Sequence, residues 1–158
     1  MDIRIGQGHD IHALVEGREL WLGGVKIPFH LGLKGHSDAD ALLHAIMDAL
    51  LGALALGDIG QLFPDTDATY KGISSAKLVE IVVAKVHEAG YRVGNLDCMI
   101  HCEQPKIGPH RESIVRKISE LLKISSDRVS VKAGTNEGFD AVGQKQAIIC
   151  QAIVLLLK

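Results

Sequence analysis

Apolar residues recur at helical spacing between Asp38 and Leu56, which predicts a helix over that range. Ser37 is placed to cap its first turn, with Asp40 three residues on as in a capping box. Gly57 follows the last turn, where glycine readily takes the left-handed conformation that ends helices. The apolar face of this helix carries Leu42, Leu43, Ile46, Leu50, Leu51 and Leu54.

Two more helices are predicted further along the chain. One covers Ser75–Ala89 and ends at Gly90, which again suits a left-handed cap. The other follows Pro109, because proline favours a first helical turn. Its apolar face carries Ile114, Val115, Ile118, Leu121 and Leu122.

Extended segments alternate with these helices. Ile3 and Ile5 alternate with polar residues, which predicts a strand leading into Gly6-Gln7-Gly8. For residues 147–157 the β-branched content favours a buried strand, although periodicity alone leaves a helix open. The alternation indicates an α+β or α/β domain with a helix layer on a sheet. Other extended segments are a bent strand or short hairpin at 19–27 and strands at 96–102 and 129–133.

Composition narrows the class of protein. The chain has 158 residues, 47% hydrophobic and 23% charged, which fits one globular domain over residues 1–158. The net charge of −2 has no basic excess, so we expect no nucleic-acid partner. We expect no membrane partner either, because the most apolar stretch, residues 147–157, is shorter than the ~20 residues of a membrane helix.

Cysteine usage and the N-terminus bear on the compartment. Cys98, Cys102 and Cys150 are sparse and odd in number, as in a protein with reduced thiols. The opening residues MDIRIGQGHD contain no apolar or Arg/Ser-rich leader. We therefore expect a cytoplasmic protein.

The first candidate site combines Asp10, His12 and His44. Residues two apart on an extended segment point to the same side, so Asp10 and His12 can converge on one ion. His44 lies on the first predicted helix, in a polar stripe with Asp40 and Asp48. One carboxylate and two imidazoles suit Zn²⁺ and leave a fourth position open. The alternative is a solvated helix face beside an unrelated loop histidine.

Four other segments carry polar residues suited to a phosphate or a sugar. Gly35–Asp38 precedes a helix N-terminus, which favours phosphate, although simple capping by Ser37 explains it equally well. The run 57–67 holds three acids, more than a turn requires. Lys132–Gly138 and Glu103–Lys106 each follow a strand, where catalytic and binding loops often lie.

The order and spacing of these segments resemble one family, the 2-C-methyl-D-erythritol 2,4-cyclodiphosphate synthases. The resemblance covers about residues 3–157, and the HSD-x-D-x-x-x-H-A … GDIG-x-x-FPDTD run is its most specific part. It is carried by the stretches GHDIHAL, LKGHSDADALLHAIMDALLGALALGDIGQLFPDTD, YKGISSAKL, GYRVGNLD, QPKIGPH and VSVKAGTNEG.

The resemblance implies a reaction and an assembly. The enzyme would be a metal-dependent lyase that converts 4-diphosphocytidyl-2-C-methyl-D-erythritol 2-phosphate to the 2,4-cyclodiphosphate with release of CMP, in non-mevalonate isoprenoid biosynthesis. It implies a homotrimer of α+β subunits, with a mixed sheet facing the threefold axis, helices packed on the other face, and active sites between neighbouring subunits.

The resemblance also assigns residues. Asp10, His12 and His44 match Zn²⁺ ligands, and Glu137 matches the acid near a second divalent cation, Mg²⁺ or Mn²⁺. His36 and Thr135 are the expected catalytic residues. The expected substrate-binding residues are Asp10, His12, His36, Ser37, Asp58, Ile59, Gly60, Phe63, Pro64, Asp65, Thr66, Asp67, Cys102, Glu103, Gln104, Pro105, Lys106, Ile107, Gly108, Gly134, Thr135, Asn136 and Glu137.

The chain departs from the family between Gly138 and Ala147. A phenylalanine and an arginine that the family places beside the trimer axis fall at Ala141 and Gln144. Two other interpretations stay open, and the altered segment permits the second of them. One is a mononuclear zinc hydrolase that activates water, and the other is a trimeric metal- or nucleotide-binding module without catalysis.

Overall fold

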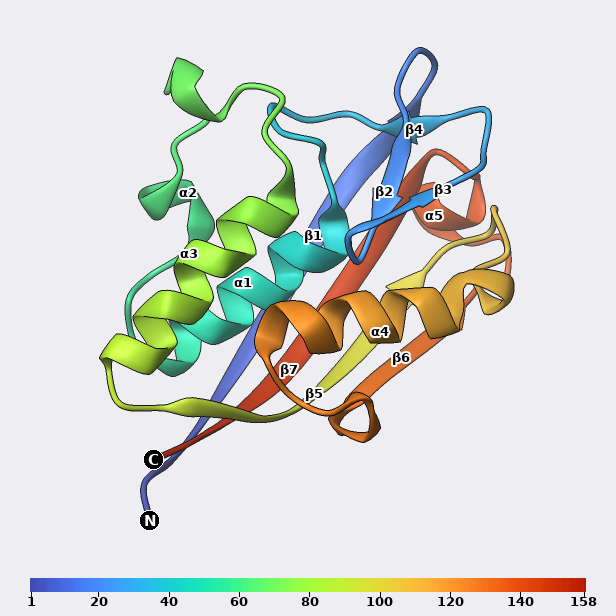
Figure 1. The fold of residues 1–158 in the computed structure, drawn as a ribbon. Helices are drawn as coiled ribbons and strands as arrows, with labels where there is room; N and C mark the ends of the chain where they lie inside the picture. Colours follow the sequence, from blue (N-terminus) through green and yellow to red (C-terminus); the bar gives the residue numbers. More distant parts are fainter.

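A five-stranded mixed sheet forms the centre of the computed structural model, which describes residues 1–158 (Figure 1). β5 and β6 are parallel, and the other neighbouring strands are antiparallel. In spatial order the strands are β4 (Gly32–Leu33), β1 (Ile3–Val15), β7 (Ala147–Leu157), β5 (Arg92–His101) and β6 (Val129–Gly134). The predicted α+β class and the strand interpretation of residues 147–157 are confirmed.

Three long helices lie on one face of this sheet (Figure 1). They are α1 (Ala41–Ala53), α3 (Ser75–Glu88) and α4 (Arg111–Leu122). A core of 39 buried residues fills the space between helices and sheet. The short elements are α2 (Ile59–Leu62), α5 (Asp140–Gly143), and the 3₁₀ turns η1 (Ala68–Tyr70), η2 (Gly108–His110) and η3 (Ser126–Arg128).

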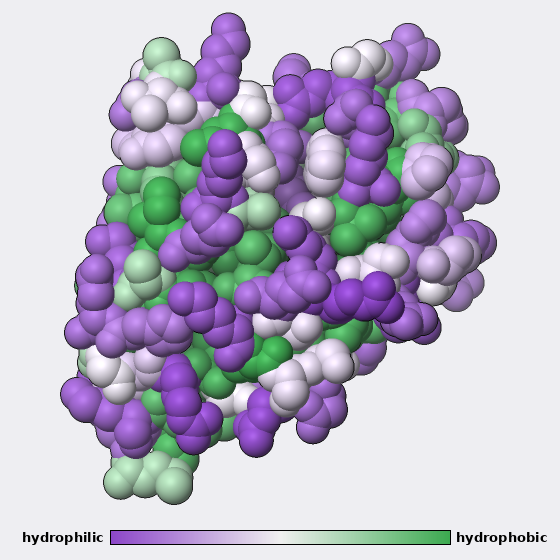
Figure 2. All heavy atoms as spheres, in the orientation of Figure 1, coloured by the Kyte–Doolittle hydropathy of each residue, from purple (hydrophilic) through white to green (hydrophobic).

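The opposite face of the sheet has no helix over it. Strand alternation directs the odd-numbered residues of β1 and β7 to this face. Four isoleucines lie there with about half or more of their surface exposed: Ile3, Ile5, Ile11 and Ile153. Hydrophilic side chains, in contrast, predominate on the outer surface of the helix layer (Figure 2). The uncovered face thus carries several exposed apolar side chains.

The ends of α1 differ from the prediction. The helix is capped by Asp40, not Ser37, because the buried Asp40 carboxylate accepts from the backbone N–H of Leu43 and from two N–H groups of the hairpin turn, at Gly23 and Gly24. At the other end α1 stops at Ala53, earlier than predicted; Ala55 is left-handed with φ 57°, and Gly57 is left-handed as predicted, with φ 82°.

The glycines of β1 also differ from the prediction. The strand does not end at Gly6-Gln7-Gly8 but runs through it to Val15. A Cβ on Gly6 would lie 1.8 Å from the carbonyl oxygen of Ala49. Glycine is therefore required for α1 to lie directly on the strand.

The remaining predicted elements are present. Residues 19–27 form the hairpin of β2 (Leu20–Leu22) and β3 (Val25–Ile27), and α3 ends at Gly90 with φ 79°. None of the helices combines the length and the apolar character needed to cross a bilayer.

Candidate active site

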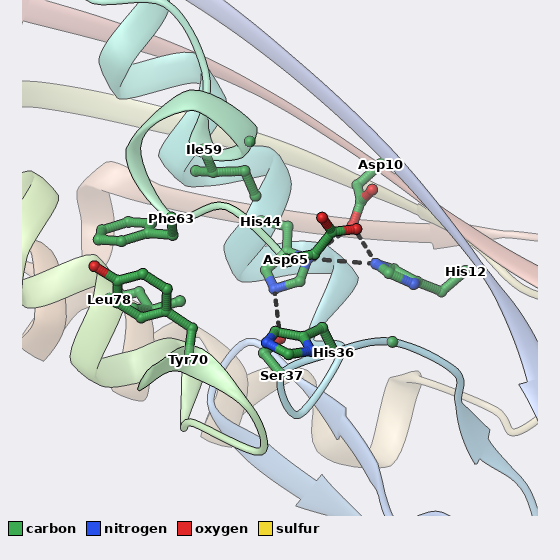
Figure 3. A pocket seen from close by; sticks show the side chains of 12 residues that line it. Asp10, His12, His36, Ser37, His44, Ile59, Phe63, Asp65, Tyr70 and Leu78 are labelled. Atoms are coloured by element: carbon green, nitrogen blue, oxygen red, sulfur yellow. Dashed lines mark hydrogen bonds and ion pairs between the residues drawn. The ribbon is translucent and has the colours of Figure 1, made fainter. Parts of the chain in front are cut away.

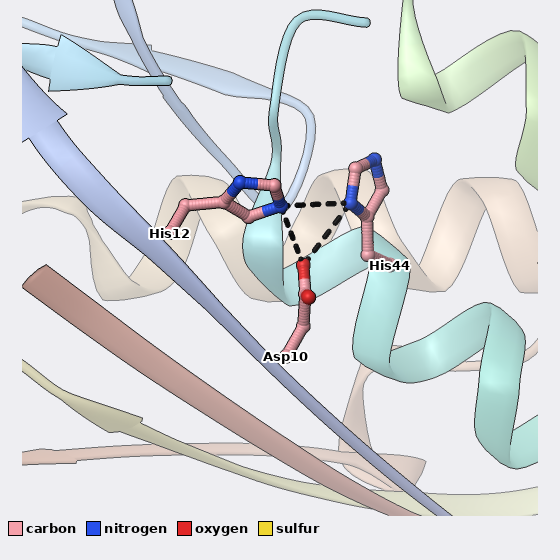
Figure 4. Close-up of side chains that lie close together, drawn as sticks. All are labelled: Asp10, His12 and His44. Carbon is pink, nitrogen blue, oxygen red and sulfur yellow. Dashed lines mark hydrogen bonds and ion pairs between the residues drawn. The ribbon is translucent and has the colours of Figure 1, made fainter. Parts of the chain in front are cut away.

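Asp10, His12 and His44 converge on one point at the edge of the sheet (Figure 4). Asp10 Oδ2 lies 2.9 Å from His12 Nε2 and 3.1 Å from His44 Nδ1, and the two nitrogens are 3.3 Å apart. Asp10 and His12 point to the same side of β1, and His44 projects from the first turn of α1. The predicted cluster is confirmed as a spatial group.

The second ring nitrogen of His12 defines how this imidazole can bind an ion. Its Nδ1 lies 2.6 Å from the carbonyl oxygen of Lys34, which can only accept a hydrogen bond. In the neutral ring the proton therefore sits on Nδ1, so Nε2, which faces Asp10 and His44, is the nitrogen that can bind an ion. Metal-binding histidines commonly donate their other ring nitrogen in this way.

Electrostatics favours a cation at this point. Burial acts to raise the pKa of Asp10, but hydrogen bonds from His12 and His44 outweigh burial and lower this pKa to about 2. Burial acts to lower the pKa of His12, and the hydrogen bond to Asp10 outweighs it, so this pKa is raised. One carboxylate oxygen and two imidazole nitrogens form a donor set suited to a divalent metal ion.

The polar stripe predicted along α1 serves three purposes. His44 belongs to the candidate metal cluster, whereas Asp40 caps the helix. Asp48 accepts a hydrogen bond of 2.8 Å from the backbone N–H of Ile59, and burial raises the pKa of its carboxyl group. Asp48 therefore holds the start of α2 against α1, beside the cluster.

A cavity of about 410 Å³ opens around the cluster (Figure 3). One wall is an aromatic pair, Phe63 and Tyr70, whose ring centres are 5.3 Å apart. Of the substrate residues predicted within 58–67, Asp58, Pro64, Thr66 and Asp67 do not line it. The lining residues are Asp10, His12, Gly35, His36, Ser37, His44, Ile59, Gly60, Phe63, Asp65, Tyr70 and Leu78.

The acids outside the cavity shape its rim. The Asp58 side chain accepts from the N–H of Gln61 and caps α2, and the Asp67 side chain accepts from the N–H of Thr69 and caps η1. The carbonyl oxygen of Asp67 lies 3.1 Å from His36 Nε2. The loop 63–73 is thereby tied to the segment that precedes α1.

A second pocket, of about 270 Å³, lies where β5 and β6 end and α4 begins. Glu103, Gln104, Asn136 and Glu137 do not line it; the Glu103 carboxylate accepts from the N–H of Asn136 at 2.8 Å. Its lining residues are Cys102, Pro105, Lys106, Ile107, Gly108, Pro109, Arg111, Ala133, Gly134 and Thr135.

The two pockets are separate within one chain. They share no residue, and β7 and β5 lie between the strands that carry them, β1 and β6. Three steps between strands amount to roughly 14 Å. The hairpin fills the space between α1 and α4, since a Cβ on Gly23 would lie 2.5 Å from Ile114 and 3.2 Å from Leu42.

Glu137 stands apart from the candidate metal cluster. It follows the second pocket, is exposed, and has a left-handed backbone with φ 53°. Asp10, His12 and His44 form the only group of three or more His, Cys, Asp or Glu side chains close enough to hold a metal ion. Glu137 thus has no companion ligands within its own chain.

Comparison with known proteins decides the family. The sequence model of the YgbB family matches residues 3–157. The chain belongs to the YgbB family. It is 54% identical over 158 residues to the 2-C-methyl-D-erythritol 2,4-cyclodiphosphate synthase of Ralstonia pickettii, covering 100% of this chain and 94% of that protein.

Solved structures agree with this YgbB assignment. One, of a 2C-methyl-D-erythritol-2,4-cyclodiphosphate synthase, has a TM-score of 0.91 and 41% identity over 98% of this chain and 100% of its own. A CDP-bound form of such a synthase has a TM-score of 0.90 and 40% identity, with the same coverage of both chains.

The structure of this YgbB-family chain adds site residues that sequence patterns missed. Tyr70 and Leu78 line the first cavity, and Arg111 lines the second pocket. Ser75 Oγ lies 3.0 Å from His44 Nε2. In the sequence, only its place at a predicted helix start distinguished Ser75. Its contact with His44 joins residues 31 positions apart, so no local pattern could predict it.

Proposed function

We propose that this YgbB-family protein converts 4-diphosphocytidyl-2-C-methyl-D-erythritol 2-phosphate to 2-C-methyl-D-erythritol 2,4-cyclodiphosphate and CMP, in the non-mevalonate isoprenoid pathway. The observation that carries the proposal is the Asp10-His12-His44 cluster inside a cavity of about 410 Å³. The name of the 54% identical relative supports the same reaction.

The reaction is a phosphoryl transfer within one molecule. An oxygen of the 2-phosphate bonds to the β-phosphorus, the bond from that phosphorus to the bridging oxygen breaks, and CMP leaves with the bridging oxygen. Such a transfer requires two anionic groups to be held together with their charge offset. No side chain of the protein need form a covalent bond.

Asp10, His12 and His44 would hold Zn²⁺, and their donor atoms fit it. When bound, this ion supplies Lewis-acid stabilisation of negative charge on phosphoryl oxygens. His36 and Ser37 line the same cavity and would contact the phosphates. Asp58, Ile59 and Gly60 would bind the methylerythritol hydroxyls, and residues 63–67 the rest of the substrate.

The second pocket would bind the nucleotide. Residues Cys102–Gly108 would enclose cytosine, read mostly by backbone groups, with the Lys106 ammonium nearby. Thr135, with Gly134 and Asn136, would donate to the reacting phosphates, and Glu137 would approach a second divalent cation, Mg²⁺ or Mn²⁺. A CDP-bound structure 40% identical to this chain supports a nucleotide ligand.

The protein would act as a homotrimer with shared active sites. Within one chain the strands that carry the metal cluster and the second pocket, β1 and β6, lie three strand steps apart, roughly 14 Å. The hairpin packs between Leu42 of α1 and Ile114 of α4. A neighbouring subunit can bring its own second pocket to the first cavity. The uncovered sheet face with its exposed isoleucines supplies an apolar surface for that contact.

The compartment would be the cytoplasm, or the plastid stroma for a mature chain. Cys98, Cys102 and Cys150 are all free and buried, and burial raises their pKa values, to about 12 for Cys98 and about 11 for Cys102. Unpaired, unreactive thiols suit a reducing compartment.

One assay tests the proposed reaction. Purified protein loaded with Zn²⁺ is incubated with the diphosphocytidyl substrate and Mg²⁺, and the products are followed by ³¹P NMR. We expect CMP and the cyclic diphosphate in equal amounts. A linear methylerythritol phosphate product would instead show a hydrolase, and an unchanged substrate would show a binding module.

A further inference from the structure

Ser75 and Asp38 lie behind His44, on the side away from Asp10. Ser75 Oγ is 3.0 Å from His44 Nε2 and donates its proton to Asp38 Oδ1. The other oxygen of Asp38 accepts the backbone N–H of Ser75 at 2.9 Å. The Asp38 carboxylate therefore binds both the hydroxyl and the amide of one residue.

A serine hydroxyl has a single proton, and Ser75 uses that proton in its hydrogen bond to Asp38. Asp38 as a carboxylate can only accept, so Ser75 must be its donor. The Ser75 oxygen then meets His44 Nε2 with lone pairs, and Nε2 must carry the ring proton. The Nδ1 atom of His44, which faces Asp10 and His12, is then the nitrogen that can bind a metal ion, and an ion there would replace its hydrogen bond to Asp10.

We infer that Asp38 and Ser75 form a positioning relay that fixes the ring of His44 for metal binding. The inference rests on the proposed metal site and assigns to it two residues that do not touch the ion. Ser75 is completely buried, so no solvent replaces its hydroxyl. Hydrogen-bond partners of this kind orient a ligand ring and select its tautomer.

Ser37 cannot perform the same task. Its Oγ lies 3.2 Å from His44 Nε2 and accepts the N–H of Ala39 at 3.1 Å. No carboxylate takes the Ser37 proton, so this hydroxyl can either donate to Nε2 or accept from it. Ser37 is therefore compatible with either neutral tautomer of His44, whereas Ser75 is compatible only with the tautomer that carries the proton on Nε2.

The test compares Ser75→Ala with Ser74→Ala, its neighbour in the chain. Ser74 is exposed and its side chain makes no capping hydrogen bond. Ser75→Ala keeps the backbone N–H that Asp38 binds, so the start of α3 stays capped. Zn²⁺ affinity is measured by chelator competition, and the Co²⁺ form is examined by visible absorption.

We expect Ser75→Ala to weaken Zn²⁺ binding by about 10–100-fold and to alter the Co²⁺ absorption bands, with both readouts unchanged in Ser74→Ala. A purely structural role would lower the melting temperature of the zinc-free and zinc-loaded forms equally and leave the affinity intact. A folded Ser75→Ala with Zn²⁺ affinity within twofold of the wild type would overturn the relay.

A second variant covers the case in which Ser75→Ala does not fold. Asp38→Asn keeps an oxygen that can accept the Ser75 backbone N–H but removes the charge that commits the hydroxyl proton. Weakened Zn²⁺ binding is again expected, and unchanged binding overturns the relay. Because metal binding is measured without substrate, these outcomes are distinct from failure to form the cyclic product.

Discussion

A Cβ atom on Gly8 would lie 1.8 Å from the carbonyl oxygen of Ala45. Strand β1 and helix α1 therefore touch backbone to backbone at this point, with no side chain between them. His44 precedes Ala45, and Asp10 lies two residues beyond Gly8. The close contact is what brings an imidazole from the helix to within hydrogen-bonding distance of a carboxylate on the strand.

Gly8→Ala should accordingly destabilise the fold by at least about 3 kcal/mol, because the backbone of α1 must move to admit the methyl group. Gly52→Ala is the matched control: Gly52 is exposed on the same helix, and a Cβ there comes no closer than 3.9 Å to Gln7. That change should stabilise by up to about 1 kcal/mol. Urea denaturation measures the free energy of unfolding of both variants. Equal changes in the two would contradict the backbone contact between β1 and α1 at Gly8.

His44→Ala should abolish Zn²⁺ retention and turnover, since two remaining ligands hold zinc poorly. His87→Ala, on an exposed side chain of α3, is the control and should retain both. Metal analysis after dialysis gives the zinc content of each protein. Near-normal zinc in His44→Ala would refute the metal assignment.

Thr135→Ala should lower kcat on the order of 10²-fold with little change in CMP affinity, because the proposed contact is to the reacting phosphates. Steady-state kinetics gives kcat, and calorimetric titration gives the CMP affinity. If the loss instead appeared only as weaker CMP binding, Thr135 would belong to nucleotide recognition.

Mixing His44→Ala with Thr135→Ala tests whether active sites are shared. If each site takes its metal cluster from one subunit and its nucleotide pocket from the next, random mixed trimers contain about a quarter of sites with both parts intact. Co-refolding the two variants should restore activity to about that fraction of the wild type. Sedimentation should show three chains, and no recovery in mixed trimers would place each site within one chain.

Zinc binding should weaken as pH falls, beginning above the ordinary His12 pKa of 6.5, because that pKa is raised in the metal-free protein and Zn²⁺ must displace the proton. Asp10, with a pKa of about 2, stays ionised throughout. Chelator competition between pH 5 and 9 should give about a tenfold loss per pH unit below the His12 pKa.

The raised pKa of His12 gives the stability of the metal-free protein the opposite pH dependence. A raised His12 pKa stabilises the folded state fully below pH 6.5 and ceases to do so as pH rises through the folded value. Melting temperatures of the metal-free protein should therefore fall across this range relative to a His12→Asn variant. Parallel curves for the two proteins would contradict the His12–Asp10 pairing.

The sequence by itself predicted most of the helices and strands and the candidate metal cluster of Asp10, His12 and His44. Periodicity in a single chain segment is enough to define α1 and α3, because each must bury one face, whereas β-branched content favoured the strand β7. The spacing of Asp10 and His12 placed both on one side of an extended segment, and the structure confirms that they meet His44.

Tertiary structure alone decided the features that depend on distant partners. Asp40 replaced Ser37 as the cap because two of its three hydrogen-bond donors, Gly23 and Gly24, lie 17 and 16 residues away in the hairpin. Ser75 reached His44 across 31 residues. Strand order set the gap between the candidate metal cluster and the second pocket. Side-chain hydrogen bonds and strand order join segments that are remote along the chain, and local patterns contain no record of such pairings.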